Sequence, residues 1–138
     1  MNKILSISKL FLALSVLFVI CFSSIFPSCS VSTANLSGVK LCSSLSGTEC
    51  GGDVSSFPAD VPVIYCSASV NNAPSQTKVL IEWKHGSESL GTMEREIESG
   101  YIHATLKPNS TLAPGQYSVT LKIASDNSTP ITKQFTLE

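Results

Sequence analysis

The feature of this sequence that most constrains its fold is an alternation of apolar and polar residues that recurs from about residue 36 to the C-terminus. The clearest example places apolar residues at alternate positions, namely Tyr117, Val119, Leu121 and Ile123. Because successive side chains of a β-strand point to opposite faces of a sheet, this spacing predicts a strand with one buried face. No segment of this region combines a helical period with capping residues, so we expect an all-β domain.

Similar segments bounded by turn residues recur along the chain and predict about seven short strands. Turn signals occur roughly every dozen residues, which is typical of a β-sandwich. The predicted strands cover residues 36–41, 63–70, 78–84, 93–98, 101–107, 117–123 and 131–137.

The segment 93–98 is predicted to be an edge strand, because charged residues dominate it and would discourage another chain from pairing there. Alternation puts Glu94, Glu96 and Glu98 on one face of this strand, without the backbone loop that a calcium site needs. We therefore expect a solvated edge and no cation site. The preceding residues 85–91 are predicted to form a loop.

Three residues on these strands resemble the core signature of immunoglobulin-type sandwiches. Cys66, Trp83 and Tyr117 follow the order of the strand-B cysteine, the strand-C tryptophan and the strand-F tyrosine. The segment 114–121, Pro-Gly-Gln-Tyr-Ser-Val-Thr-Leu, is similar to the start of strand F in immunoglobulin-like and fibronectin type III-like domains. The resemblance implies a single immunoglobulin-like β-sandwich, in which the Tyr117 hydroxyl bonds back to the backbone of the preceding corner.

The sequence departs from the antibody pattern two residues beyond Tyr117, where Val119 stands in place of the second cysteine. An inter-sheet disulfide is therefore excluded, and Cys66 is expected to be a buried thiol that packs near Trp83 as a small hydrophobic residue. Sandwiches of this type in exported bacterial proteins usually serve as binding, adhesion or structural modules. The resemblance implies a function of this kind.

The N-terminus predicts export. Residues 1–9 carry two lysines and no acid, and an apolar run follows over residues 10–26. A basic segment followed by such a run is typical of a signal peptide. The expected organisation is a signal peptide at 1–29, a linker at 30–37 and the immunoglobulin-like sandwich at 38–138.

Three fates of this N-terminal segment are compatible with the sequence. Residues 26–29, Phe-Pro-Ser-Cys, resemble the lipobox of bacterial lipoproteins, which implies cleavage and lipidation of Cys29. Small residues at Ser32 and Ala34 instead suit an ordinary signal peptidase, which would release a soluble protein beginning at Asn35. The apolar run is only slightly shorter than a spanning helix, so an uncleaved anchor is the third alternative. The protein is expected to be a membrane-anchored lipoprotein or a periplasmic or secreted protein.

Cys42 and Cys50 are predicted to form a local disulfide. The segment 43–49 between them is polar and flexible enough to let the two sulfurs meet, and disulfides persist outside the cytoplasm. A metal site is not expected, because these cysteines lack C-x-x-C spacing and the histidines, His85 and His103, lie far away in sequence.

Charge argues against nucleic acid as a partner. Removal of the signal peptide and its two lysines leaves seven basic residues against ten acidic ones, a net charge of −3, with no basic cluster. Contact with a membrane is expected only through the lipid anchor or an uncleaved signal helix.

No catalytic or cofactor-binding residues are expected. Catalysis needs a nucleophile, a base and an orienting group, and no serine of this chain lies in a nucleophile motif. His85 is expected in a solvated loop after a strand end. His103 is expected on the surface, because it alternates with the inward Ile102 and Ala104.

The sequence therefore favours a non-catalytic exported module at the cell envelope that binds an unknown protein or glycan partner. Tyr65 and Tyr101, both expected on outer sheet faces, are the candidates for an exposed aromatic patch. Two alternatives remain open. One is a passive structural component of the envelope, and the other is a small secreted inhibitor whose contact is the loop between Cys42 and Cys50.

Overall fold

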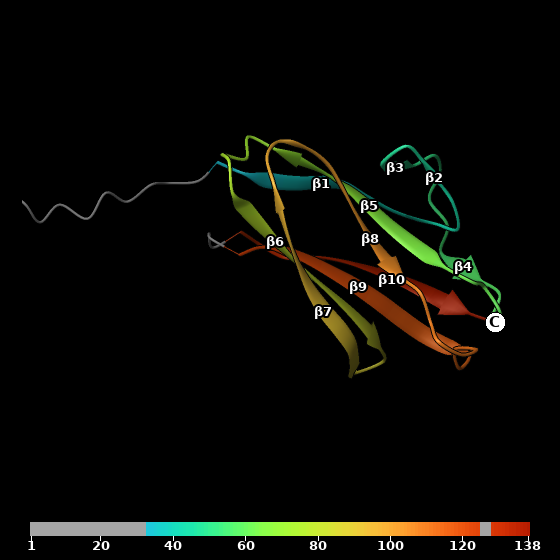
Figure 1. Ribbon diagram of the computed structural model, residues 1–138. Coiled ribbons are helices and arrows are strands. Elements are labelled where there is room, and N and C mark those ends of the chain that lie inside the picture. Colours follow the sequence, from blue (N-terminus) through green and yellow to red (C-terminus); the bar gives the residue numbers. More distant parts are fainter. Residues whose placement is uncertain (1–32, 125–127) are drawn as a thin grey trace, which may run out of the picture. The chain divides into compact units, whose positions relative to one another are not determined.

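The computed structural model describes residues 33–124 and 128–138, and every regular element in these two ranges is a β-strand (Figure 1). The predicted signal peptide and Cys29 lie outside the described residues. Within the two ranges, no helix has the length and hydropathy of a membrane span. The expectation of an all-β domain is confirmed.

The strands form two large sheets and one small hairpin. The first sheet contains, in spatial order, β1 (Asn35–Cys42), β5 (Ile64–Asn71) and β8 (Gly100–Leu106). The second contains, in spatial order, β4 (Ser56–Phe57), β10 (Ile131–Leu137), β9 (Gly115–Ile123), β6 (Thr77–His85) and β7 (Glu88–Ile97). The hairpin consists of β2 (Leu45–Ser46) and β3 (Glu49–Cys50). Neighbouring strands are antiparallel except for β4 and β10, which are parallel.

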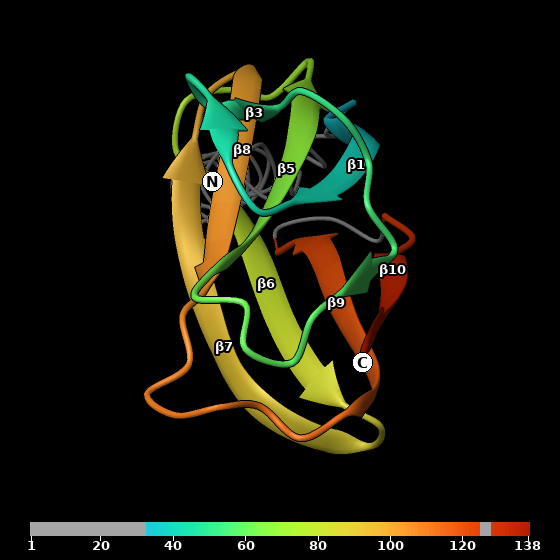
Figure 2. The same cartoon turned by 90° about the vertical axis from the view of Figure 1, so that its right-hand side faces the viewer.

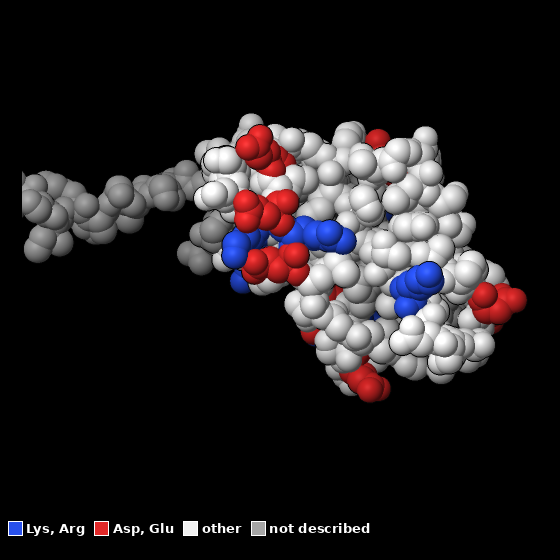
Figure 3. Space-filling view, in the orientation of Figure 1, with Lys and Arg blue, Asp and Glu red and all other residues white. Residues whose placement is uncertain are grey.

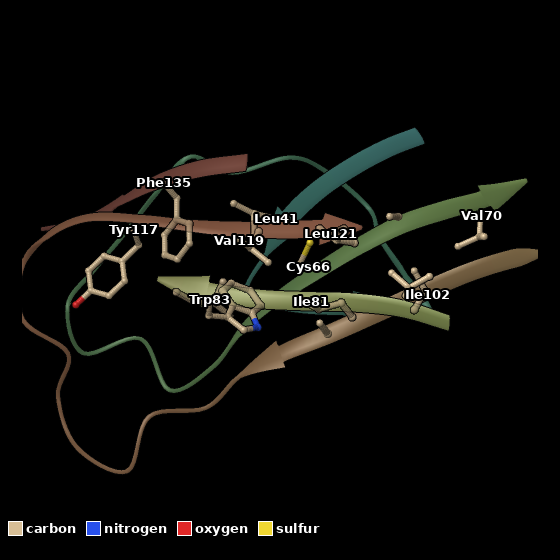
Figure 4. Close-up of a cluster of buried hydrophobic side chains, with 14 of the residues drawn as sticks. Leu41, Cys66, Val70, Ile81, Trp83, Ile102, Tyr117, Val119, Leu121 and Phe135 are labelled. Atoms are coloured by element: carbon tan, nitrogen blue, oxygen red, sulfur yellow. The ribbon is translucent and has the colours of Figure 1, made fainter. Parts of the chain in front are cut away.

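The two large sheets pack face to face around an apolar core, which makes the domain a β-sandwich (Figure 2). The alternation seen in the sequence is what forms this core, because it turns every second side chain of β6 and β9 inward. Ile81 and Trp83 of β6 and Val119 and Leu121 of β9 are each at most 3% exposed. Cys66 and Leu41 contribute to the same core from the other sheet (Figure 4).

An aromatic cluster fills one end of the core, centred on Phe135 of β10. Its ring lies 5.8 Å from that of Phe57 and 6.1 Å from that of Trp83, both edge-on, and stacks on Tyr117 at 5.5 Å. Edge-to-face and offset-stacked pairs are the favoured arrangements of aromatic rings. The cluster therefore ties together four strands of the larger sheet, β4, β6, β9 and β10.

Tyr117 makes the corner contact that the resemblance to immunoglobulin-like domains implies. Its side chain is 2% exposed, and its hydroxyl donates a 2.7 Å hydrogen bond to the carbonyl oxygen of Ala113, four residues upstream. Burial raises the pKa of this hydroxyl above its ordinary value. The bond fixes the turn that leads into β9.

The variant Tyr117→Phe is expected to lower the free energy of unfolding by about 1 kcal/mol, because it removes this partly buried hydrogen bond and leaves the Ala113 carbonyl without its partner. Urea unfolding followed by circular dichroism measures the change. Tyr101→Phe is the matched control, since Tyr101 is 50% exposed, and we expect it to change stability by less than about 0.5 kcal/mol. Equal effects of the two variants would contradict a structural role for the corner bond.

Seven of the strands are seven residues or longer and correspond to the seven predicted ones, but β7 differs in where it begins. It starts at Glu88, inside the segment 85–91 that was predicted to be a loop. The difference arises from a tight hairpin, because His85 pairs with Glu88 and only Gly86 and Ser87 connect them. Gly86 has a φ of +56°, which suits the first central position of a type II′ turn.

The first strand also begins earlier than expected. β1 starts at Asn35, so the last three residues of the predicted linker, Asn35 to Ser37, belong to the sandwich. The Asn71 side chain anchors them, since its amide nitrogen donates to Asn35 Oδ1 at 3.1 Å and to Ser37 Oγ at 3.0 Å.

Candidate functional site

Cys42 and Cys50 form the predicted disulfide, with a Cα–Cα distance of 5.7 Å. The residues between them are not the flexible loop that the sequence suggested. They form the hairpin of β2 and β3, whose turn uses Gly47 at a φ of +69°. Gly47 and its neighbour Thr48 are exposed, so the disulfide braces a small projecting hairpin.

This disulfide-braced hairpin covers part of the outer face of the sheet β1-β5-β8. The N–H of Cys50 donates a 2.9 Å hydrogen bond to Oγ of Ser67 in β5, and both residues are at most 1% exposed. Lys40 and Glu49 add an ion pair at 3.0 Å at the rim. Ser67, which alternation places on the outer face, is therefore buried beneath the hairpin.

The hairpin separates the two tyrosines that were candidates for an aromatic patch. Tyr65 and Ser69 lie on the same face of β5, with the covered Ser67 between them, and Tyr101 lies opposite Ser69. Tyr101 is 50% exposed, whereas Tyr65 is half-buried. The structure thus places both tyrosines on the outer face but does not bring them together.

One side of the sandwich, where β1 and β10 face each other, is closed by the segment that follows the hairpin. Asp53 accepts a 3.0 Å hydrogen bond from the N–H of Leu41 in β1 and pairs with Lys133 in β10. The N–H of Thr136 in β10 donates to the carbonyl of Ser55 at 2.9 Å. Burial raises the pKa of Asp53, but its bonds with Lys133 and Leu41 outweigh this and hold the pKa below its ordinary value.

The opposite side of the sandwich is formed by β7 and β8, each of which is the edge strand of its sheet (Figure 2). The predicted edge strand is thereby confirmed. β7 carries the charged residues Glu88, Glu94, Arg95 and Glu96, and it is interrupted by a bulge opposite Trp83. Charges and bulges are the devices that keep an edge from pairing with other chains. Figure 3 shows charged side chains gathered around the end of β7.

β8 has none of these protections. Its seven residues include no charged residue and no proline, and its register with β5 runs without a bulge from Gly100 to Leu106. Its other edge pairs with no strand of the described residues. An uncharged edge strand without a bulge presents free backbone N–H and C=O groups to an incoming strand.

A cleft opens between the two edges, with a volume of about 190 Å³. It is lined by Trp83 of β6, residues 90–93 of β7 and residues 105–107 at the end of β8. The bulge in β7 leaves Leu90 at its rim, 40% exposed. Trp83 is 3% exposed, and its indole nitrogen has no hydrogen-bond partner. Buried donors in proteins almost always have a partner, so this one requires an explanation.

Cys66 is a buried free thiol in the same apolar core as Trp83, as expected. Burial raises the pKa of Cys66 to about 12, because the thiolate would lose its hydration in the core. The inward position that a second cysteine would occupy is filled by Val119, which is fully buried.

The folded protein is expected to resist alkylation of Cys66 near neutral pH and to react only when unfolded, since the thiolate is the reactive form. Because the folded-state pKa exceeds the ordinary value of 9.0, the folded state retains a proton that the unfolded state releases, so stability falls as the pH rises from about 9 to about 12. Mass spectrometry after iodoacetamide treatment measures the reactivity. Urea unfolding of the protein and of Cys66→Ala measures the pH effect, and an identical alkaline slope in the two proteins would contradict the assignment.

The two histidines lie on different sheets. His85 is the last residue of β6 and not a solvated loop residue, because its ring stacks on Tyr117 with centroids 4.3 Å apart. His103 lies on the outer face of β8 as expected, half-buried and opposite Ser67. Glu94 pairs with Lys78 at 2.8 Å. In the described ranges, no three His, Cys, Asp or Glu side chains are placed to share a metal ion.

Sequence reasoning missed the features that distinguish this surface. The lack of charge in residues 100–106 was visible in the sequence, but it gains significance only if that strand lies at an edge. The sequence around Leu90 did not predict that its side chain is exposed, because this exposure follows from the bulge in β7. The unpartnered indole of Trp83 depends on the spacing of two strands that are not paired with each other.

Comparison with known proteins gives a likeness of fold alone. No family model matches the sequence, and no curated protein matches it. A solved structure of a β-glucosidase from Erythrobacter marinus is similar to 77% of this chain, with a TM-score of 0.50 and 15% sequence identity. The matched part spans 15% of that enzyme chain. The likeness therefore describes how the strands are arranged in a small part of a much larger protein.

Proposed function

We propose that this chain is an exported, non-catalytic binding module of the immunoglobulin-like or fibronectin type III-like type, displayed at the cell envelope, which binds a protein partner along the free edge of β8. The observation that carries the proposal is the asymmetry of the sandwich. One side is closed by the segment around Asp53, whereas the other presents a seven-residue edge strand without charge, proline or bulge.

The fold type is supported by the core. The hydrogen bond of Tyr117 to the preceding corner and the buried Trp83 are the features expected of strands F and C in immunoglobulin-like domains. Export is supported by the disulfide between Cys42 and Cys50, because such bonds persist in oxidising compartments. The N-terminal sequence pattern supports the same destination.

A protein partner is favoured over a glycan by the chemistry of the edge. β8 offers a row of backbone donors and acceptors at the spacing of a β-strand, which an extended peptide can match residue by residue. A non-catalytic function is supported by the positions of His85 and His103. They lie on strands of different sheets, so the two imidazoles do not form one acid–base pair.

Affinity capture with the exported full chain, followed by mass spectrometry, tests the proposal. We expect a partner that is retained by the protein and lost with Tyr101→Lys, which places a charge on β8. The matched control is Thr132→Lys, which adds the same charge at an exposed position on β10, and it should retain the partner. Capture of nothing, or equal capture by both variants, would contradict binding along β8 and would favour a passive structural component.

The same preparation reports the fate of the N-terminus. A lipidated peptide beginning at Cys29 would support the lipoprotein form. An unmodified peptide beginning at Asn35 would instead support a released protein.

An inhibitor role for the hairpin is a second candidate, because its tip is exposed while its base is braced by the disulfide and by the bond to Ser67. Thr48→Arg changes the tip without touching the buried base. Loss of a captured partner with Thr48→Arg, together with its retention by Tyr101→Lys, would favour the hairpin over β8.

A further inference from the structure

We infer that the cleft beside β8 is a specificity pocket for one acidic side chain, preferably glutamate, of an extended peptide that adds to the β8 edge. The inference rests on the proposed function, because it supplies the chemistry of the partner that β8 binds. It joins two independent observations, the free edge of β8 and the buried indole N–H of Trp83 that lacks a partner.

The size of the cleft limits its occupant to a single side chain. Its volume of about 190 Å³ is below the roughly 300 Å³ at which pockets for small-molecule ligands begin. Leu90, Met93 and Leu106 give it apolar walls, which suit the methylene groups of a longer side chain. A cofactor or an oligosaccharide would not fit.

The polar groups of the cleft call for an acceptor. Trp83, which lines the cleft, carries an indole N–H that can only donate and that has no partner. Lys107 adds a positive charge at the rim and makes no ion pair with a described residue. No acidic residue lines the cleft. A carboxylate, which only accepts hydrogen bonds, complements this set.

The position of the cleft matches the direction in which a bound peptide would send its side chains. Ile102, Ala104 and Leu106 of β8 point into the sandwich, so a strand added beside them directs alternate side chains inward as well. Leu106 and Trp83 line the same cleft, so an inward side chain of the added strand at the level of Leu106 would lie beside Trp83. Figure 4 shows the indole nitrogen on the side of the ring that faces the end of β8.

The test uses the full chain and blocked peptides of alternating threonine and valine that carry Glu, Gln, Leu or Lys at the central position. The chain has a single tryptophan, so its indole N–H gives one assignable peak in a proton–nitrogen correlation spectrum. We expect the Glu peptide to shift this peak in a saturable manner and to bind about fivefold or more tightly than the Gln peptide, because hydrogen bonds to a charged group are the stronger ones. The Lys peptide should leave the peak unchanged.

Lys107→Gln is expected to weaken binding of the Glu peptide about two- to fivefold and to reduce the preference for Glu over Gln. Lys122→Gln, at an exposed position on β9, is the matched control and should leave both unchanged. Backbone methylation of the Glu peptide at alternate amides distinguishes strand addition from side-chain binding alone. Only the series whose methyl groups face β8 should fail to bind.

Several outcomes would overturn the inference. These are an unshifted indole peak with every peptide, equal binding of the Glu and Lys peptides, and equal binding of the two methylated series. A self-associated chain whose β8 edge is occupied by a second copy would overturn it too, and sedimentation at increasing dilution detects this state. If the captured partner is lost with Tyr101→Lys while the peptides show no preference for Glu, the inference fails and the proposed function stands.

Discussion

Replacement of Phe135 by alanine is expected to lower the free energy of unfolding by about 3 to 5 kcal/mol, the cost of truncating a large aromatic side chain in a packed core. Phe135 is 2% exposed and contacts the rings of Phe57, Trp83 and Tyr117. Its loss removes the centre of the cluster that ties β4, β6, β9 and β10 together. Because the free energy of unfolding of small domains is only about 5 to 15 kcal/mol, this single substitution would remove much of the stability of the domain.

Chemical unfolding followed by the fluorescence of Trp83 measures the effect and reports on the cluster itself. Gln134→Ala is the matched control, because Gln134 is the preceding residue of β10 and is exposed. It should change stability by less than about 0.5 kcal/mol. A small effect of Phe135→Ala, comparable to that of the control, would mean that the aromatic cluster is not the centre of the core.

Removal of the disulfide by the double variant Cys42→Ala and Cys50→Ala is expected to cost about 2 to 3 kcal/mol, the chain-entropy value for a loop this short. The structure adds a local consequence. The hairpin of β2 and β3 is held to the sheet by the bond from the Cys50 N–H to Ser67, so its amides should exchange faster once the brace is lost. The core around Phe135 should remain folded.

Equilibrium unfolding and hydrogen exchange measure the two effects separately. A reducing agent should destabilise the unmodified protein by a similar amount and should have no further effect on the double variant. Undiminished protection of the Cys50 amide in the double variant would show that the hairpin is held by its packing on β5 and that the disulfide is dispensable.

The strands themselves could be predicted because their signal is local. Alternation alone indicates which face of each strand is buried. The structure places the inward residues it predicts in the core, for example Ile81, Trp83, Val119 and Leu121. The corner at Tyr117 was also within reach, because the residues that make it lie close together in sequence.

The open edge was out of reach because it depends on how strands far apart in sequence are arranged. β7 pairs with β6 in the larger sheet, so no strand of the described residues pairs with the second edge of β8. If β7 had instead joined the smaller sheet and paired with β8, β8 would have been an inner strand with the same sequence. Alternation does not indicate which sheet a strand joins. It also does not predict that the hairpin of β2 and β3 buries Ser67.

The start of β7 shows a third limit. Charge and glycine between His85 and Gly91 suggested a loop, but the tight turn at Gly86 lets the strand resume at Glu88. The polar residues of this segment are tolerated because they lie on an exposed edge, where no core demands alternation. The resulting bulge exposes Leu90 and shapes the cleft over Trp83.

The most direct test of binding along β8 is amide hydrogen exchange of the full chain with and without its captured partner. A partner that adds a strand must bond to the backbone amides of β8 that point away from β5. These alternate along the strand with the amides that are already bonded to β5. The account predicts slower exchange at alternate residues between Gly100 and Leu106, with β7 and the hairpin unchanged. Unchanged exchange along β8, with new protection elsewhere on the sandwich, would contradict it.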